Sequence, residues 1–190
     1  KGGMGKKGIT TREEDTVTDV FTASTHDNLL FFTDTGKVYR KKGYQVPESG
    51  KTARGSNIVN LIQVEPGERV QTMLHYRPGT EETLFLTMVT RNGTVKRLPV
   101  ETLKNLKNIG IRALTLEEGD ALIAVKETDG SQNILIATHD GQAIRFPEEK
   151  VRAMGRDAVG VRGIQLRDGD YVVGAGVVRP GRSVLAITEK

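Results

Sequence analysis

The sequence contains no cysteine and no tryptophan, and aromatic residues make up only 5% of its 190 residues. The absence of cysteine excludes disulfide bonds and thiolate metal ligands, and it is typical of reducing compartments. No apolar run reaches the ~18 residues that a membrane-spanning helix needs, and no apolar stretch of a signal peptide follows the N-terminal Gly and Lys residues. We therefore expect a cytosolic protein without membrane contact, whose core consists mainly of Val, Ile and Leu.

Motifs for catalysis and metal binding are also lacking. His26 and His139 both stand in the tripeptide THD, but they fall at different points of the sequence pattern, and His75 has no such context. There is no phosphate-binding loop of the type GxxxxGK[ST] and no nucleophile elbow. The adjacent acidic residues Glu13-Glu14 and Glu148-Glu149 are expected to face solvent. The sequence thus predicts no catalytic residue, no metal site and no cofactor in this chain.

The sequence does contain a repeat of about 50 residues. Each copy has an apolar run, a polar turn that ends in Gly, a short basic segment and a Pro, as in LFLTMVTRNGTVKRLP and NILIATHDGQAIRFP. The final residues, SVLAITEK, resemble the start of a fourth copy, so we expect part of a longer array. The landmarks that recur in order are Gly36, Gly93 and Gly141, then Pro47, Pro99 and Pro147, then Gly55, Gly110 and Gly160, then Gly67, Gly119 and Gly169.

Each repeat is typical of β-structure. Its apolar runs are short, rich in β-branched and aromatic residues, and bounded by turn residues. Asn92-Gly93 and Asp140-Gly141 predict tight hairpins of type I′, and the only expected helices are single turns after Pro99 and Pro147. Four short strands in about 50 residues predict a propeller-like, all-β array of three complete blades and the start of a fourth, which fits better than a β-solenoid. The expected repeats are 17–79, 80–130, 131–181 and a partial 182–190.

Charge is sorted by position within the repeat. The net charge is only +4, with an isoelectric point near 9.3, which favours an anionic partner without identifying one. The turns EPGE, EEGD and RDGD are acidic, whereas two other segments of each repeat are basic. Stacked repeats would place the basic segments along one rim, which suits the backbone of a nucleic acid duplex better than a small ligand. The candidate DNA-binding residues are Lys37, Arg40, Lys41, Lys42, Arg54, Lys96, Arg97, Arg112, Arg145, Arg152, Arg156 and Arg162.

The segments LLFFTDTGKVYR and TARGSNIVNL closely resemble the first blade of the C-terminal domain of the DNA gyrase A subunit, and the resemblance continues through nearly the whole chain. It implies a β-pinwheel, a propeller-like disc whose blades partly exchange strands. The family begins this domain with the gyrase box, Gln-Arg-Arg-Gly-Gly-x-Gly. Residues 1–16 then contain the remaining part of this box and a leader, and residues 17–190 form one β-pinwheel domain. The box residues are Lys1, Gly2, Gly3, Met4 and Gly5, and Lys1, Lys6 and Lys7 join the candidate DNA contacts.

The resemblance implies a DNA-wrapping module of a bacterial type II topoisomerase. Its partners would be duplex DNA, the rest of gyrase A and the gyrase B subunit, while ATP, Mg²⁺ and the cleaving tyrosine would belong to other parts of that A2B2 enzyme. Such a chain would act in the bacterial cytoplasm at the nucleoid. Three alternatives stay open: a topoisomerase IV domain that guides DNA without full wrapping, a propeller scaffold for protein partners, and an RNA-binding module.

Overall fold

The computed structural model describes residues 27–42, 62, 64–105 and 110–179. The gyrase box, the leader 1–16, Lys6, Lys7, His26, Arg54 and the partial fourth repeat therefore lie outside the described residues. Within them, no helix is long and apolar enough to cross a membrane.

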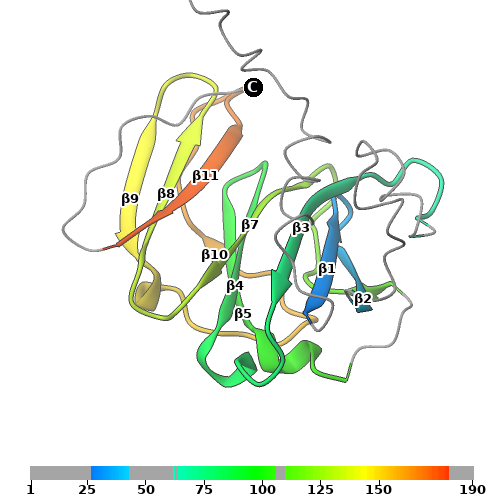
Figure 1. Ribbon diagram of the computed structural model, residues 1–190. Coiled ribbons are helices and arrows are strands. Elements are labelled where there is room, and N and C mark those ends of the chain that lie inside the picture. The colour runs from blue at the N-terminus through cyan, green and yellow to red at the C-terminus, as the bar shows by residue number, and fades with distance from the viewer. Residues whose placement is uncertain (1–26, 43–61, 63, 106–109, 180–190) are drawn as a thin grey trace, which may run out of the picture.

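The described chain consists almost entirely of β-strands in three antiparallel sheets, which follow one another around the molecule (Figure 1). This confirms the all-β, propeller-like prediction. The first sheet has the order β3-β1-β2-β6, the second β10-β5-β4-β7 and the third β11-β8-β9. The strands are β1 (Asn28–Thr33), β2 (Lys37–Lys42), β3 (Val70–Tyr76), β4 (Phe85–Thr90), β5 (Thr94–Pro99), β6 (Ile111–Arg112), β7 (Leu122–Thr128), β8 (Asn133–Thr138), β9 (Ala143–Pro147), β10 (Val161–Arg162) and β11 (Val172–Val178).

The fourth strand of a sheet comes from the following repeat. β6 belongs to the second repeat but pairs with β2, and β10 belongs to the third repeat but pairs with β5. Gly110 makes the first exchange possible, because a Cβ at this position would collide with the ring of Tyr39. The four-stranded blade is thus confirmed for the first two sheets, and neighbouring blades exchange strands as the resemblance implied.

The hairpins have a different turn from the predicted type I′. Gly93 and Gly141 have positive φ angles of 89° and 90°, but no other residue type among those described has a positive φ, whereas a type I′ turn needs two such residues. In the second sheet the N–H of Gly93 donates to the carbonyl of Thr90 at 3.0 Å. Three residues therefore connect β4 to β5, with glycine alone in the left-handed region, as in the three-residue hairpin loop.

Single helical turns follow Pro99 and Pro147, as predicted. These are η3 (Val100–Leu103) and η4 (Glu148–Lys150), and each proline stands at the N-cap rather than at the first helical position. A third turn, η2 (Glu81–Thr83), was not predicted.

The core lies between the blades, and the central strand β1 of the first sheet is covered on both faces. All six residues of β1 are buried, which explains why its sequence is a continuous apolar run and not an alternating one. Leu30 and Phe32 pack toward the second sheet, against residues such as Leu86. Leu29 and Phe31 pack on the other face of β1. Each such side chain contributes roughly 1.5–3 kcal/mol by its burial, so the contacts between blades are a main source of stability.

Candidate nucleic-acid interface

Two arginines are exposed at equivalent positions on the outer edges of neighbouring sheets. Arg112 ends β6 opposite Lys37, and Arg162 ends β10 opposite Thr94. Each follows its exchanged glycine, Gly110 or Gly160, by two residues, so the repeat places them alike. The strand exchange therefore carries one exposed guanidinium to the perimeter of each of these two sheets.

A second pair of exposed cations follows the single helical turns. Lys104 comes directly after η3 and Arg152 shortly after η4. Arg152 was predicted as a DNA contact, whereas Lys104 was missed. The signal was available in the repeat, because Lys104 stands five residues after Pro99 and Arg152 stands five residues after Pro147. We call Arg112, Arg162, Lys104 and Arg152 the rim residues.

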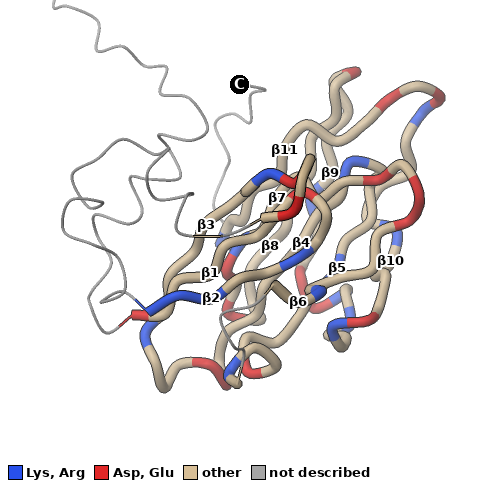
Figure 2. Tube along the Cα trace, turned by 90° about the vertical axis from the view of Figure 1, so that its right-hand side faces the viewer, with Lys and Arg blue, Asp and Glu red and all other residues tan. Residues whose placement is uncertain are grey.

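The basic residues of β2 are half-buried, and most of this strand is blue in Figure 2. The Nη1 of Arg40 donates to the backbone carbonyl of Lys104 at 2.7 Å, which links the first repeat to the second. Lys37 pairs with Glu65, with 2.8 Å between Nζ and Oε1. Lys41 and Lys42 complete the basic stretch of this strand.

The structure contradicts the prediction that Lys96 contacts DNA. Its side chain is completely buried, and its Nζ donates to the backbone carbonyls of Ala113, Arg156 and Ala158 at 2.7, 2.8 and 2.9 Å. Burial lowers the pKa of Lys96 to about 8, so the ammonium is still largely charged at neutral pH. Lys96 therefore holds the exchanged segments against β5 and has no access to a phosphate.

Arg97 is also turned into the protein, contrary to its prediction as a DNA contact. Its side chain is 11% exposed and its Nη1 lies 3.2 Å from the fully buried carboxylate of Glu148. Its Nε donates to the carbonyl of Val151 at 2.9 Å, and its guanidinium lies 4.4 Å from the ring centroid of Phe85. Arg97 thus links the second repeat to the third, and Glu148, predicted to face solvent, is interior.

Arg97 has counterparts in the other two repeats. Arg40, Arg97 and Arg145 each stand four residues after their hairpin glycine. Arg40 and Arg97 both donate to a carbonyl at or just after the helical turn of the next repeat. Arg145 is exposed on β9, and Arg156 is half-buried in the segment before β10. One recurring basic position is therefore mainly a connector between blades.

The acidic turns have a structural role that the sequence did not reveal. Asp120 and Asp170 accept hydrogen bonds from the backbone N–H groups of Asn92 and Asp140 at 2.9 and 3.0 Å, so each turn clasps the hairpin of its own sheet. In the first sheet Glu68 is buried and accepts hydrogen bonds from hydroxyl groups of Thr33, Thr35 and Tyr39. Burial alone would raise the pKa of Glu68, but these hydrogen bonds lower it overall. The acidic turns thus partly consist of fixed hydrogen-bond acceptors within their own sheets.

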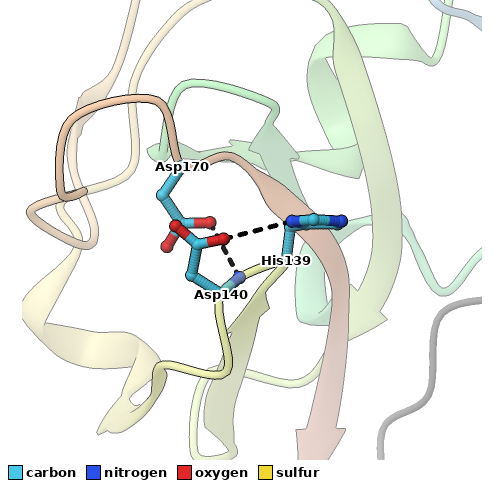
Figure 3. A group of neighbouring side chains, drawn as sticks. All are labelled: His139, Asp140 and Asp170. Carbon is cyan, nitrogen blue, oxygen red and sulfur yellow. Dashed lines mark hydrogen bonds and ion pairs between the residues drawn. The ribbon is translucent and has the colours of Figure 1, made fainter.

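His139, Asp140 and Asp170 come together at one hairpin (Figure 3). Nδ1 of His139 lies 3.2 Å from Asp140, and its ring stacks on Tyr171 with 4.7 Å between the centroids. The carboxylate of Asp170 is already engaged in turns, since its Oδ1 accepts from the N–H groups of Asp140 and Tyr171. Asp120 makes the same bonds to Asn92 and Ala121 in the second sheet without a histidine. The arrangement is therefore a repeated element of the fold.

The fold and its perimeter define a class: strand-exchanging, propeller-like β-repeat domains with exposed cations at recurring outer positions. The family model described as "DNA gyrase C-terminal domain, beta-propeller" matches residues 1–24, 27–75, 85–129 and 132–179. The chain belongs to this family.

Similar proteins agree with this assignment. The chain is 43% identical to the DNA gyrase A protein of Staphylococcus aureus (strain MRSA252) over 191 aligned residues, which cover 100% of the chain but 22% of that protein. Among solved structures, the C-terminal domain of DNA topoisomerase IV has a TM-score of 0.73 at 29% identity, over 81% of this chain and 48% of that one. A DNA gyrase A C-terminal domain has a TM-score of 0.65 at 24% identity, over 80% and 48%, and this likeness shows the fold alone. The chain therefore corresponds to about a fifth of its curated relative.

Proposed function

We propose that this domain binds duplex DNA through its phosphates and bends it around the outer edges of the sheets. The observation that carries the proposal is the recurrence of exposed Arg112 and Arg162 at equivalent outer positions. Cations that repeat from blade to blade suit a regularly spaced polyanion. Among the described residues the helices are single turns of three or four residues, too short to read a major groove, so contact would be independent of sequence.

In this proposal the domain presents DNA to a whole gyrase, which introduces negative supercoils. Bending 20–30 base pairs costs on the order of 1–6 kcal/mol, and phosphate contacts along the rim offset this cost. The domain itself supplies no catalytic residue and holds no cofactor. ATP, Mg²⁺ and the cleaving tyrosine act elsewhere in the assembly of gyrase A and gyrase B, in the bacterial cytoplasm at the nucleoid.

A second candidate function is guidance of DNA without full wrapping. The likeness to the topoisomerase IV C-terminal domain supports it. A protein scaffold has less support, because Ile144 and Val161, each 37% exposed, are the only exposed large hydrophobic side chains among the described residues, and a docking face needs a contiguous patch.

Removing both arginines at the outer edges should weaken DNA binding and its salt dependence together. For Arg112→Ala/Arg162→Ala we expect affinity for a 40-base-pair duplex to fall about tenfold near 0.1 M salt, and the slope of log K against log salt to become shallower by up to ~1.8, since each phosphate contact contributes at most ~0.9. The loss should be equal for unrelated sequences. Fluorescence anisotropy between about 50 and 200 mM salt measures both quantities.

The matched control is Arg77→Ala/Lys126→Ala, which removes the same charge from exposed positions at the end of β3 and on β7, the inner-edge strands. For this control the slope of log K against log salt should stay close to that of the parent chain. An equal loss in both double variants would show that net charge, and not the outer edge, governs binding.

A further inference from the structure

A hollow of about 490 Å³ lies at the outer edge of the first sheet. The β1–β2 hairpin, the first acidic turn and the exchanged strand β6 surround it, and its lining includes Thr35, Lys37, Glu65, Glu68 and Arg112. Two repeats thus contribute to one site, and it contains charges of both signs.

The two cations of this hollow face each other across a strand pair. Lys37 and Arg112 are directly opposite in the β2–β6 register, and like charges in this arrangement repel. The hydrogen bond from Lys37 to Glu65 raises the pKa of the lysine, while Arg112 acts in the opposite sense. An anion beside this pair relieves the repulsion, and the carboxylate of Glu65 provides one.

The two acidic residues of the hollow differ in how firmly they are held. Glu68 is buried and accepts hydrogen bonds from three hydroxyl groups. The side chain of Glu65 is 70% exposed, and that of its partner Lys37 is 31% exposed. Exposed pairs of this kind are weak and are screened by salt. An incoming anion can therefore displace Glu65 without disturbing Glu68 or the turn.

We propose that Lys37 and Arg112 form a phosphate subsite for duplex DNA, and that Glu65 occupies this subsite in the free domain. When DNA binds, one of its phosphates replaces the Glu65 carboxylate in this subsite. The inference rests on the proposed function and adds to it an internal competitor, which lowers affinity and masks one phosphate contact.

The other repeats lack this combination. Thr94 and Gln142 stand at the position of Lys37, and Glu117 and Arg167 stand at the position of Glu65. Arg162 corresponds to Arg112 and faces Thr94. The second sheet therefore has the arginine, supplied by the third repeat, and the glutamate, but no lysine between them, which makes Glu117 a matched control.

The test is duplex binding by Glu65→Gln, which removes the charge and keeps the shape. Affinity for a 40-base-pair duplex near 0.1 M salt should rise about two- to fivefold, and the slope of log K against log salt should become steeper by ~0.9. Glu117→Gln makes the same change in net charge, but its slope should stay unchanged. Adding Lys37→Met to Glu65→Gln should abolish the increase in affinity and in slope.

The outcomes separate the two proposals. If the parent chain binds duplex and Glu65→Gln behaves like Glu117→Gln, the subsite is wrong while DNA binding stands. If the parent chain does not bind duplex at about 50 mM salt, the proposed function and the subsite are both overturned.

Discussion

Replacing Lys96 by methionine should lower the free energy of unfolding by about 3 kcal/mol or more. The ammonium donates to three backbone carbonyls and is completely buried. Methionine fills a similar volume but has no donor, and each buried acceptor left without a partner costs about 1–3 kcal/mol. The removal of a buried charge offsets part of this loss. Urea unfolding followed by circular dichroism measures the difference.

Lys126→Met is the control, because Lys126 is exposed on β7 and its replacement should change stability by no more than about 0.5 kcal/mol. The same variants also test the corrected role of Lys96. At a temperature where Lys96→Met is folded, its affinity for duplex DNA should equal that of the parent chain. A stable Lys96→Met protein that has lost DNA binding would contradict this role and show that Lys96 contacts DNA.

The second large effect is expected from breaking the pair between Arg97 and Glu148. Glu148 is fully buried, and its carboxylate accepts from Arg97 and from the N–H of Gln132 at 3.1 Å. Glu148→Leu leaves the mostly buried guanidinium without its counter-ion, which typically costs about 3–5 kcal/mol. We expect a loss of about this size in urea unfolding.

The double variant Arg97→Met/Glu148→Leu should regain about half of that loss, because replacement of both partners removes the uncompensated charge. Glu149→Leu changes the exposed neighbour and should leave stability within about 0.5 kcal/mol. If the double variant is less stable than Glu148→Leu, the hydrogen bond from Arg97 to Val151 outweighs the ion pair.

The sequence alone was sufficient to predict the repeat, the all-β class and the position of the hairpins. Glycine and proline act locally, so their recurrence at Gly36, Gly93 and Gly141 marks each turn without knowledge of its neighbours. The strand exchange was inferred only through the family resemblance. A strand of two residues, such as Ile111–Arg112, is too short for an alternating pattern, and its partner β2 lies in another repeat.

The structure was needed to separate the exposed basic residues from the buried ones, because a charged residue in a strand does not reveal what covers it. One signal was nevertheless present. Lys96 stands at the repeat position of Tyr39 and Ile144, where an apolar side chain is otherwise used, and Tyr39 is also buried. Repeat alignment would therefore have separated Lys96 from the rim residues. Glu148 had a weaker signal of the same kind, since the buried Val100 stands at its position in the second repeat but Glu48 stands there in the first.

The most direct test of the account is ligation of a nicked circular DNA in the presence of the chain, followed by separation of the topoisomers. Wrapping around the outer edges predicts a shift toward positive linking difference that grows with protein concentration and is reduced for Arg112→Ala/Arg162→Ala. A topoisomer distribution that stays unchanged while the DNA is saturated with protein would contradict wrapping and favour guidance of DNA alone.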